Sequence, residues 1–280
     1  GAVLTRGRIA IWSGFLALAF ALPLIMDSGF VISLLCQIGI MVVFSLSYNM
    51  LLGQTGLLSF GHAVYFGLGA FATMHALNVI GKDGGPLVTA LLPFIGGLAG
   101  LAAGVVLGYV TTRKAGTTFA MITLGIGELV AACSLMFPGF FGGEGGISGN
   151  RVVGKDSFLG LTWGPQVEMY GLIVLWAFIA TVAMFALTQT PLGRMANAVR
   201  DNPERAEFVG YDTQRVRYLM LILSGFFAGI AGGLSALNYE IVTAESLDAH
   251  TSGVVLLMTF VGGMGFFYGP IIGAILVSLM

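Results

Sequence analysis

Ser59 and His62 are the pair of side chains that most resembles a catalytic unit, because residues three apart share one face of a helix. A hydroxyl beside an imidazole could serve as a nucleophile and its general base. Hydrolysis in a membrane would also need a base on another element and an oxyanion hole, usually in a G-x-S-G context. The context here is Leu58-Ser59-Phe60-Gly61, and no acid lies nearby in the sequence. We therefore expect no catalytic residue and no enzyme activity in this chain.

The other histidines and the two cysteines show no pattern of a metal centre. His75 and His250 lack the spacing of metal ligands. Cys36 and Cys133 each fall inside an apolar run, where a small packing residue is the simplest interpretation. We expect neither a disulfide framework nor a metal site.

The composition indicates which elements must position these side chains. Charged residues make up 9% of the 280 residues and hydrophobic residues 57%, with a mean hydropathy of +0.95, whereas soluble domains carry about 25% charged residues. Such a chain cannot cover a water-facing surface. We predict an all-α polytopic membrane protein: a single domain over residues 1–280, a bundle of about 8–10 transmembrane helices in a lipid bilayer. The expected spans are 9–26, 30–52, 58–80, 87–111, 117–137, 169–187, 216–237 and 252–263, with a short last run at 271–280.

Positive charges in short loops predict the orientation, since cytoplasmic loops carry an excess of lysine and arginine. They cluster before the first expected span, after the fourth and after the sixth, so alternation places all three clusters and the N-terminus in the cytoplasm. Lys82, Arg151 and Lys155 fall on the outer side as exceptions. We expect 9–26 to be the first span rather than a cleaved signal peptide. The clusters hold Arg6, Arg8, Arg113, Lys114, Arg194, Arg200, Arg205, Arg215 and Arg217.

Two connections are long. The glycine-rich outer loop 138–168 is either a flexible linker or an ordered lid. The inner segment 190–214 is the most charged stretch and predicts two short helices, which we call the elbow. Its expected caps are Thr190 with Pro191, Asp201 or Asn202 with Pro203, Gly210 at C′, and Asp212 or Thr213 before the next span.

Five motifs in one order resemble a known family. They are "LLGQTGLLSFGHAVYFGLGAF", "TTFAMITLGIGELV", "GGEGGISG", the stretch beginning "PLGRMANAVRDNPERAEFVGYDTQRV", and "LLMTFVGGMGFFYGPIIGAIL". Together they resemble the branched-chain amino acid ABC transporter permeases, from about Asn49 to Leu276, and the LivM-type subunit more than its LivH-type partner. Thr118 and Glu144 depart from the pattern, which has tyrosine at the first position and commonly a small or hydroxyl residue at the second.

The resemblance implies a permease subunit of an ATP-driven importer in the cytoplasmic membrane of a bacterium or archaeon. It implies four kinds of neighbour: a LivH-type permease subunit, two cytoplasmic ATPase subunits, an extracytoplasmic binding protein and the bilayer, with no nucleic acid. This chain has no G-x-x-x-x-G-K-[ST] motif, so we expect it to bind no cofactor, with ATP and Mg²⁺ in the ATPases. The alternatives are the same machinery for urea, short amides or other amino acids, and an ion-coupled secondary transporter.

The elbow is the expected site of ATPase coupling, since a permease must receive force through a rigid cytoplasmic feature. The alternative is an ordinary solvated loop. The candidate coupling residues are Arg194, Arg200, Asp201, Glu204, Arg205, Glu207, Gly210 and Asp212.

The stretch after residue 52 predicts a broken helix, because glycines permit a break or a close helix approach. Ser59 could cap the restarted helix, with polar groups along a substrate path; tight packing, with His62 bonded to a neighbouring carbonyl, is the alternative. A second break at 262–269 would be its counterpart in an internal repeat. The break and packing residues are Gly53, Gly56, Gly61, Gly262, Gly263, Gly265, Gly269 and Pro270, and the candidate path residues are Gln54, Thr55, Ser59, His62, Thr123 and Glu128.

Glu128 is the one deeply placed charge of the expected spans. A charge at mid-membrane costs a few kcal/mol, so we expect Glu128 to face the bundle interior, to be protonated or to pair. It could meet a substrate ammonium, bond the hydroxyl of Thr123 or Ser134, or anchor two helices.

Overall fold

The computed structural model describes residues 13–18, 29–114, 116–142, 146–149, 151, 166–242, 254, 257–258 and 269–279. Within them, five helices are long and apolar enough to cross a membrane, which confirms an all-α polytopic membrane protein. The elements are α2 (Gly29–Leu52), α3 (Ala63–Thr111), α4 (Gly116–Met136), α5 (Pro138–Phe141), β1 (Ile147–Ser148), α6 (Gln166–Thr188), α7 (Pro191–Asp201), α8 (Pro203–Phe208), α9 (Thr213–Tyr239), β2 (Ile241–Val242) and α11 (Gly269–Leu279).

Four expected spans appear as single helices, namely 30–52 in α2, 117–137 in α4, 169–187 in α6 and 216–237 in α9. The final apolar run forms α11. The expected spans 9–26 and 252–263 lie mostly outside the described residues, of which only the helical 13–18 and positions 254, 257 and 258 fall within them.

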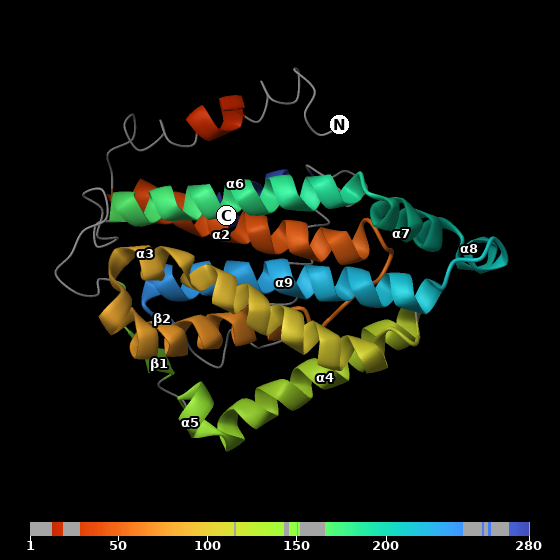
Figure 1. The fold of residues 1–280 in the computed structure, drawn as a ribbon, viewed down its shortest axis with the longest axis horizontal. Helices are drawn as coiled ribbons and strands as arrows, with labels where there is room; N and C mark the ends of the chain where they lie inside the picture. The colour runs from red at the N-terminus through yellow and green to blue at the C-terminus, as the bar shows by residue number, and fades with distance from the viewer. Residues whose placement is uncertain are drawn as a thin grey trace.

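The expected spans 58–80 and 87–111 are joined in α3, which has 49 residues but cannot be straight. In a straight helix Gly69 and Gly96 would be about 40 Å apart. Instead, a Cβ on Gly96 would lie 3.0 Å from the carbonyl oxygen of Gly69 and 2.6 Å from Oγ1 of Thr73. The helix therefore reverses between these residues, and Figure 1 shows its two arms side by side. Two antiparallel arms replace the two separate spans that the sequence predicted.

Helix α9 lies at the centre of the bundle, between α2 and α3 (Figure 1). Of the residues in an apolar 18-residue stretch of α9, 72% are buried, whereas the share is 17% in the same length of α4 at the edge of the bundle. Gly225 and Gly229 of α9 meet Gly96 and Gly100 of α3 with almost no separation. A Cβ on Gly225 would lie 2.8 Å from the carbonyl oxygen of Gly100. Backbones approach so closely only where both helices lack side chains, as in glycine-based packing of membrane helices.

At the opposite end from the elbow, the described part of the 138–168 loop is attached to the end of α9. Strand β1 pairs antiparallel with β2, with Ile147 opposite Val242. Arg151 is buried, and its Nη1 donates to the carbonyls of Leu237 and Asn238 at 3.2 and 2.9 Å. The same guanidinium pairs with Glu240 at 3.3 Å. Arg151 thus caps the C-terminal end of α9. This part of the loop is ordered, whereas 143–145 and 152–165 lie outside the described residues.

Candidate functional site

The predicted break is present between α2 and α3. Helix α2 ends at Leu52 and α3 begins at Ala63, so residues 53–62 form a non-helical segment, which we call the break. Gln54, Thr55 and Ser59 are all buried in it. Irregular backbone at such a place requires an internal partner for each polar group, because lipid supplies none.

The carbonyls at the end of α2 have these partners. The Asn49 carbonyl accepts from the N–H groups of residues 53 and 54, at 2.8 and 3.0 Å. The Met50 carbonyl accepts from Thr55 Oγ1 at 2.8 Å. The carbonyls of Leu51 and Leu52 each accept at 3.0 Å from N–H groups of residues 57 and 56. Gly56 closes this turn in the left-handed region, at φ 77°, as a glycine past a helix end commonly does. The break is a built structure rather than a loose connection.

The second half of the break is attached to α2 and α4. The hydroxyl of Tyr48 donates to the Ser59 carbonyl at 2.7 Å and accepts from the Ser59 N–H at 3.2 Å. The Phe60 N–H donates to Oγ1 of Thr123 at 3.1 Å. A Cβ on Gly61 would lie 2.5 Å from the Thr123 carbonyl, so only glycine fits there.

Ser59 does not cap α3, contrary to our expectation. The residue before the helix is His62, which makes no side-chain capping bond. Oγ of Ser59 instead accepts from the Gly61 N–H at 3.3 Å, within the break. The serine therefore organises the turn that precedes the helix rather than the helix end itself.

His62 is fully buried among aromatic rings and hydroxyls. Its Nε2 lies 3.2 Å from Oγ of Ser47 and 3.5 Å from Oγ of Ser224. Both hydroxyls already donate to carbonyls, at 2.6 Å each. The proton between Nε2 and Ser47 therefore belongs to Nε2, which donates. Its ring packs on Phe44, Tyr48 and Tyr65, with centroids 5.6, 5.1 and 5.6 Å away.

The structure brings together five of the six candidate path residues. Thr55, Ser59, His62 and Thr123 are joined to the break by the contacts above, and buried Gln54 belongs to it. Because Thr55, Ser59 and Thr123 bond to backbone groups and His62 to hydroxyls of α2 and α9, these side chains hold the break in shape. Their role along a substrate path stays a prediction.

Glu128 does not face the bundle interior, which was the first of the three arrangements expected for it. Its side chain is exposed on α4. The hydroxyls of Thr123 and Ser134 donate to carbonyls of their own helix, those of Ala120 and Ala131. Glu128 shares an exposed face with Met121 and Leu129, both 62% exposed.

The elbow forms as predicted, with its caps in place. Thr190 accepts from the Gly193 N–H at 3.3 Å, Asn202 from the Arg205 N–H at 3.1 Å, and Asp212 from the Arg215 N–H at 3.2 Å. Of the alternatives that the sequence left open, Asn202 rather than Asp201 and Asp212 rather than Thr213 are therefore the caps. Gly210 follows the end of α8 at φ 103°.

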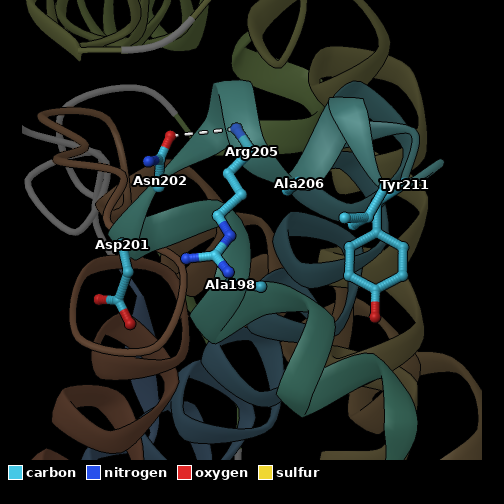
Figure 2. Close-up of a pocket in the computed structure, with 7 residues that line it drawn as sticks. Ala198, Asp201, Asn202, Arg205, Ala206 and Tyr211 are labelled. Carbon is cyan, nitrogen blue, oxygen red and sulfur yellow. Dashed lines mark hydrogen bonds between the residues drawn. The ribbon is translucent and has the colours of Figure 1, made fainter.

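The tip of the elbow combines charges with exposed apolar side chains. Phe208 and Val209 are 91% and 61% exposed. Beside them, α7 and α8 border a groove of about 330 Å³, shown in Figure 2 with Asn202 bonded to the Arg205 backbone. The groove is lined by Ala198, Asp201, Asn202, Arg205, Ala206, Val209 and Tyr211. Of the remaining coupling candidates, Arg194 and Glu204 are exposed, and Glu207 accepts from Thr213 Oγ1 at 2.9 Å.

One coupling candidate, Arg200, reaches out of the elbow. Its Nη1 donates to the carbonyl of Gly53 at 2.7 Å. Helix α7 therefore touches the break directly, a contact across 147 residues of sequence. Of the second predicted break, only Gly269 and Pro270 are described, as the start of α11; Gly262, Gly263 and Gly265 lie outside the described residues.

Sequence reasoning missed the residues that hold the break from other helices. Tyr48, Ser47 and Ser224 give no local signal, because they act across the bundle. The glycine contact between α3 and α9 did have a signal: Gly96, Gly100, Gly104 and Gly108 recur every four residues, a spacing typical of close helix packing.

Comparisons with known proteins agree with this architecture. Residues 30–280 match a family model described as branched-chain amino acid transport system, permease component. The chain is 30% identical to the high-affinity branched-chain amino acid transport system permease protein LivM of Escherichia coli (strain K12), over 93% of this chain and 65% of the relative. It is 23% identical to a probable branched-chain amino acid transport permease protein LivH of Methanocaldococcus jannaschii, over 86% and 75%. A fructose import permease protein, FrcC of Rhizobium meliloti, is 26% identical over 67% and 54%. No solved structure matches at a significant level.

Proposed function

We propose a function from the premise that this chain belongs to the family of permease components of branched-chain amino acid transport systems. The chain spans 65% of the length of the LivM proteins of Escherichia coli and Salmonella typhimurium that it matches. On that basis it is a membrane-spanning subunit of an ATP-driven importer, and the elbow is the surface on which an ATPase subunit docks.

The elbow's tip is the observation that carries this proposal. A phenylalanine that is 91% exposed on a charged, polar element is costly in water, and exposed apolar groups rimmed by charges mark protein interaction sites. Aromatic residues are frequent anchors of such interfaces. Arg205, Glu204 and Asp201 surround this anchor with charges of both signs, which favour one orientation of a partner. The groove beside Phe208 offers a place for a partner side chain.

The elbow also supports the proposed orientation of the chain in the membrane. The elbow joins α6 to α9 at the end where α2 stops (Figure 1). Its arginines favour the cytoplasmic side, where ATPase subunits would bind ATP and Mg²⁺. The β1–β2 end would then face outward, toward a binding protein. A second permease subunit would complete the pathway.

The substrate in this proposal is a branched-chain amino acid, following the family. The hydroxyls of Thr55 and Ser59 in the break are bonded within the chain, so the selection of substrate would rest mainly with the binding protein. A relative named for fructose import fits a shared mechanism that serves different delivered substrates.

Reconstitution tests the proposal. The chain is co-expressed with candidate ATPase, second permease and binding-protein subunits of the same genome, and uptake of labelled leucine into proteoliposomes is measured. Uptake is expected to require ATP and the binding protein together. Robust uptake by the chain without ATPase subunits would refute the importer and support an ion-coupled transporter.

A single variant addresses the docking surface. Phe208→Ser is expected to weaken co-purification of the ATPase subunits on the order of tenfold, because the loss of a buried aromatic anchor costs an interface about 2 kcal/mol or more. Phe30→Ser is the control, since Phe30 is 76% exposed at the start of α2, whereas the break and the elbow contact the other end of that helix. Equal ATPase binding by both variants would place the docking surface elsewhere.

A further inference from the structure

Arg200 connects the surface of the elbow with the buried end of α2. It lies in the last turn of α7. Its Nη1 donates to the Gly53 carbonyl at 2.7 Å, while Nε and Nη2 donate to the carboxylate of Asp201 at 3.0 and 3.4 Å. A guanidinium offers its donors in a rigid planar fork, so both contacts fix one orientation of the side chain.

The two segments also pack closely at Gly56. A Cβ on Gly56 would lie 2.9 Å from Cγ and 3.4 Å from Cα of Arg200. Helix α7 therefore rests on the break at Arg200, and position 56 has no room for a side chain. At its other end, a Cβ on Gly193 would lie 2.5 Å from the Leu187 carbonyl. Helix α7 is thus held at one end by α6 and at the other by the break.

The Gly53 carbonyl depends on this arginine. The four carbonyls before it, from Asn49 to Leu52, accept bonds from within α2 and the break. Gly53 is buried, and its carbonyl accepts from the elbow. A cation at the C-terminal end of a helix also interacts favourably with the helix dipole. Without the guanidinium, this carbonyl would lose its partner among the described residues.

The break in turn contacts the helices that surround it. Phe60 is bonded to Thr123 of α4, and His62 lies against Ser224 of α9. A displacement of Gly53 and Gly56 would therefore reach α2, α4 and α9 together. From these contacts, and resting on the proposed function, we infer that Arg200 is the positioning residue through which movement of the elbow reaches the break.

The experiment measures how much labelled leucine enters for each ATP hydrolysed, in proteoliposomes that hold the whole complex. Arg200→Ala is expected to lower this ratio on the order of tenfold, as the loss of a hydrogen bond to a charged group implies, while the ATPases remain bound and active. Arg200→Lys keeps a donor for Gly53 but not the fork, and is expected to give an intermediate ratio. Arg113→Ala, at an exposed arginine that follows α3 and lies outside the elbow, is expected to retain the wild-type ratio.

The outcomes separate this inference from the proposed function. A wild-type chain that binds no ATPase refutes the proposed function whatever Arg200 does. A functional wild-type complex in which Arg200→Ala keeps its ratio, or in which Arg113→Ala loses as much, overturns the inference alone. Should Arg200→Ala fail to accumulate, Gly56→Ala provides the test with Arg200 intact, because the added methyl would strain the left-handed turn at residue 56 and press on Cγ of Arg200, which disturbs the contact of α7 with the break. An unchanged ratio in Gly56→Ala would then overturn the inference.

Discussion

The contact between α3 and α9 predicts that one methyl group is damaging at Gly229 and beneficial at Gly125. A Cβ on Gly229 would lie 2.9 Å from the backbone carbon of Gly96 and 3.1 Å from Cα of Gly97, closer than real Cβ contacts. Because these are backbone atoms, the clash can be relieved only if α3 and α9 move apart. Around Gly125 of α4 nothing lies within 4 Å of the added carbon.

The magnitudes follow from this geometry. Overpacking of a well-packed site costs about 1–3 kcal/mol, and separation of the helices would also weaken their dispersion contacts. For a domain of this size, each kcal/mol shifts Tm by about 2–4 °C, so Gly229→Ala is expected to lower Tm by roughly 3–10 °C. Alanine in place of glycine within a helix is favourable by about 0.5–1 kcal/mol, so Gly125→Ala is expected to raise Tm by roughly 1–4 °C.

The assay is thermal unfolding of the purified chain in detergent, followed by tryptophan fluorescence, with both variants run beside the wild type. The two variants are expected to shift Tm in opposite directions although the chemical change is the same, so the difference reports on the surroundings of each glycine. A Tm for Gly229→Ala at or above that of the wild type would show that α3 and α9 do not meet through their backbones.

His62→Ala is expected to destabilise the chain by about 3 kcal/mol, because it empties a site enclosed by Phe44 and two tyrosines. His62→Phe is expected to cost only about 1 kcal/mol, through the lost hydrogen bond. A transport defect at unchanged Tm would instead assign His62 to the substrate. Glu128→Gln is expected to retain leucine uptake and the pH dependence of that uptake. The reason is that an exposed carboxyl without a described ion pair can be replaced by an amide that still hydrogen-bonds. Loss of uptake would show that the charge is required.

Features set by local chemistry could be predicted from the sequence. The elbow is the clearest case, since Thr190, Asn202 and Asp212 cap their helices through bonds that reach only three residues. Proline and glycine at the ends of these helices carry the same local information. The break after residue 52 was predictable for a similar reason, because glycines and hydroxyls are unfavourable in a plain lipid-facing helix.

Features set by contacts across the bundle could not be predicted. Nothing near Ser59 indicates that Tyr48 and Gly61 engage its polar groups, and so the sequence suggested a capping role that the structure does not show. One arrangement expected for Glu128 placed it inside the bundle because insertion cost depends on depth, but depth does not determine which face of α4 meets the other helices. The direction of Arg200, toward Gly53 rather than toward a partner, likewise required the packing of α7.

The cap that Arg151 places on α9 has a consequence for biosynthesis. Its acceptor carbonyls, those of Leu237 and Asn238, lie 86 and 87 residues later in the chain. Because synthesis proceeds at about 5–20 residues per second, they follow Arg151 from the ribosome by roughly ten seconds. During that interval α6, the elbow and α9 must all be made and inserted. The end of the bundle that holds β1 and β2 therefore cannot close before α9 is complete, and a nascent chain arrested within α9 would present that end unfinished to the cell's proteases.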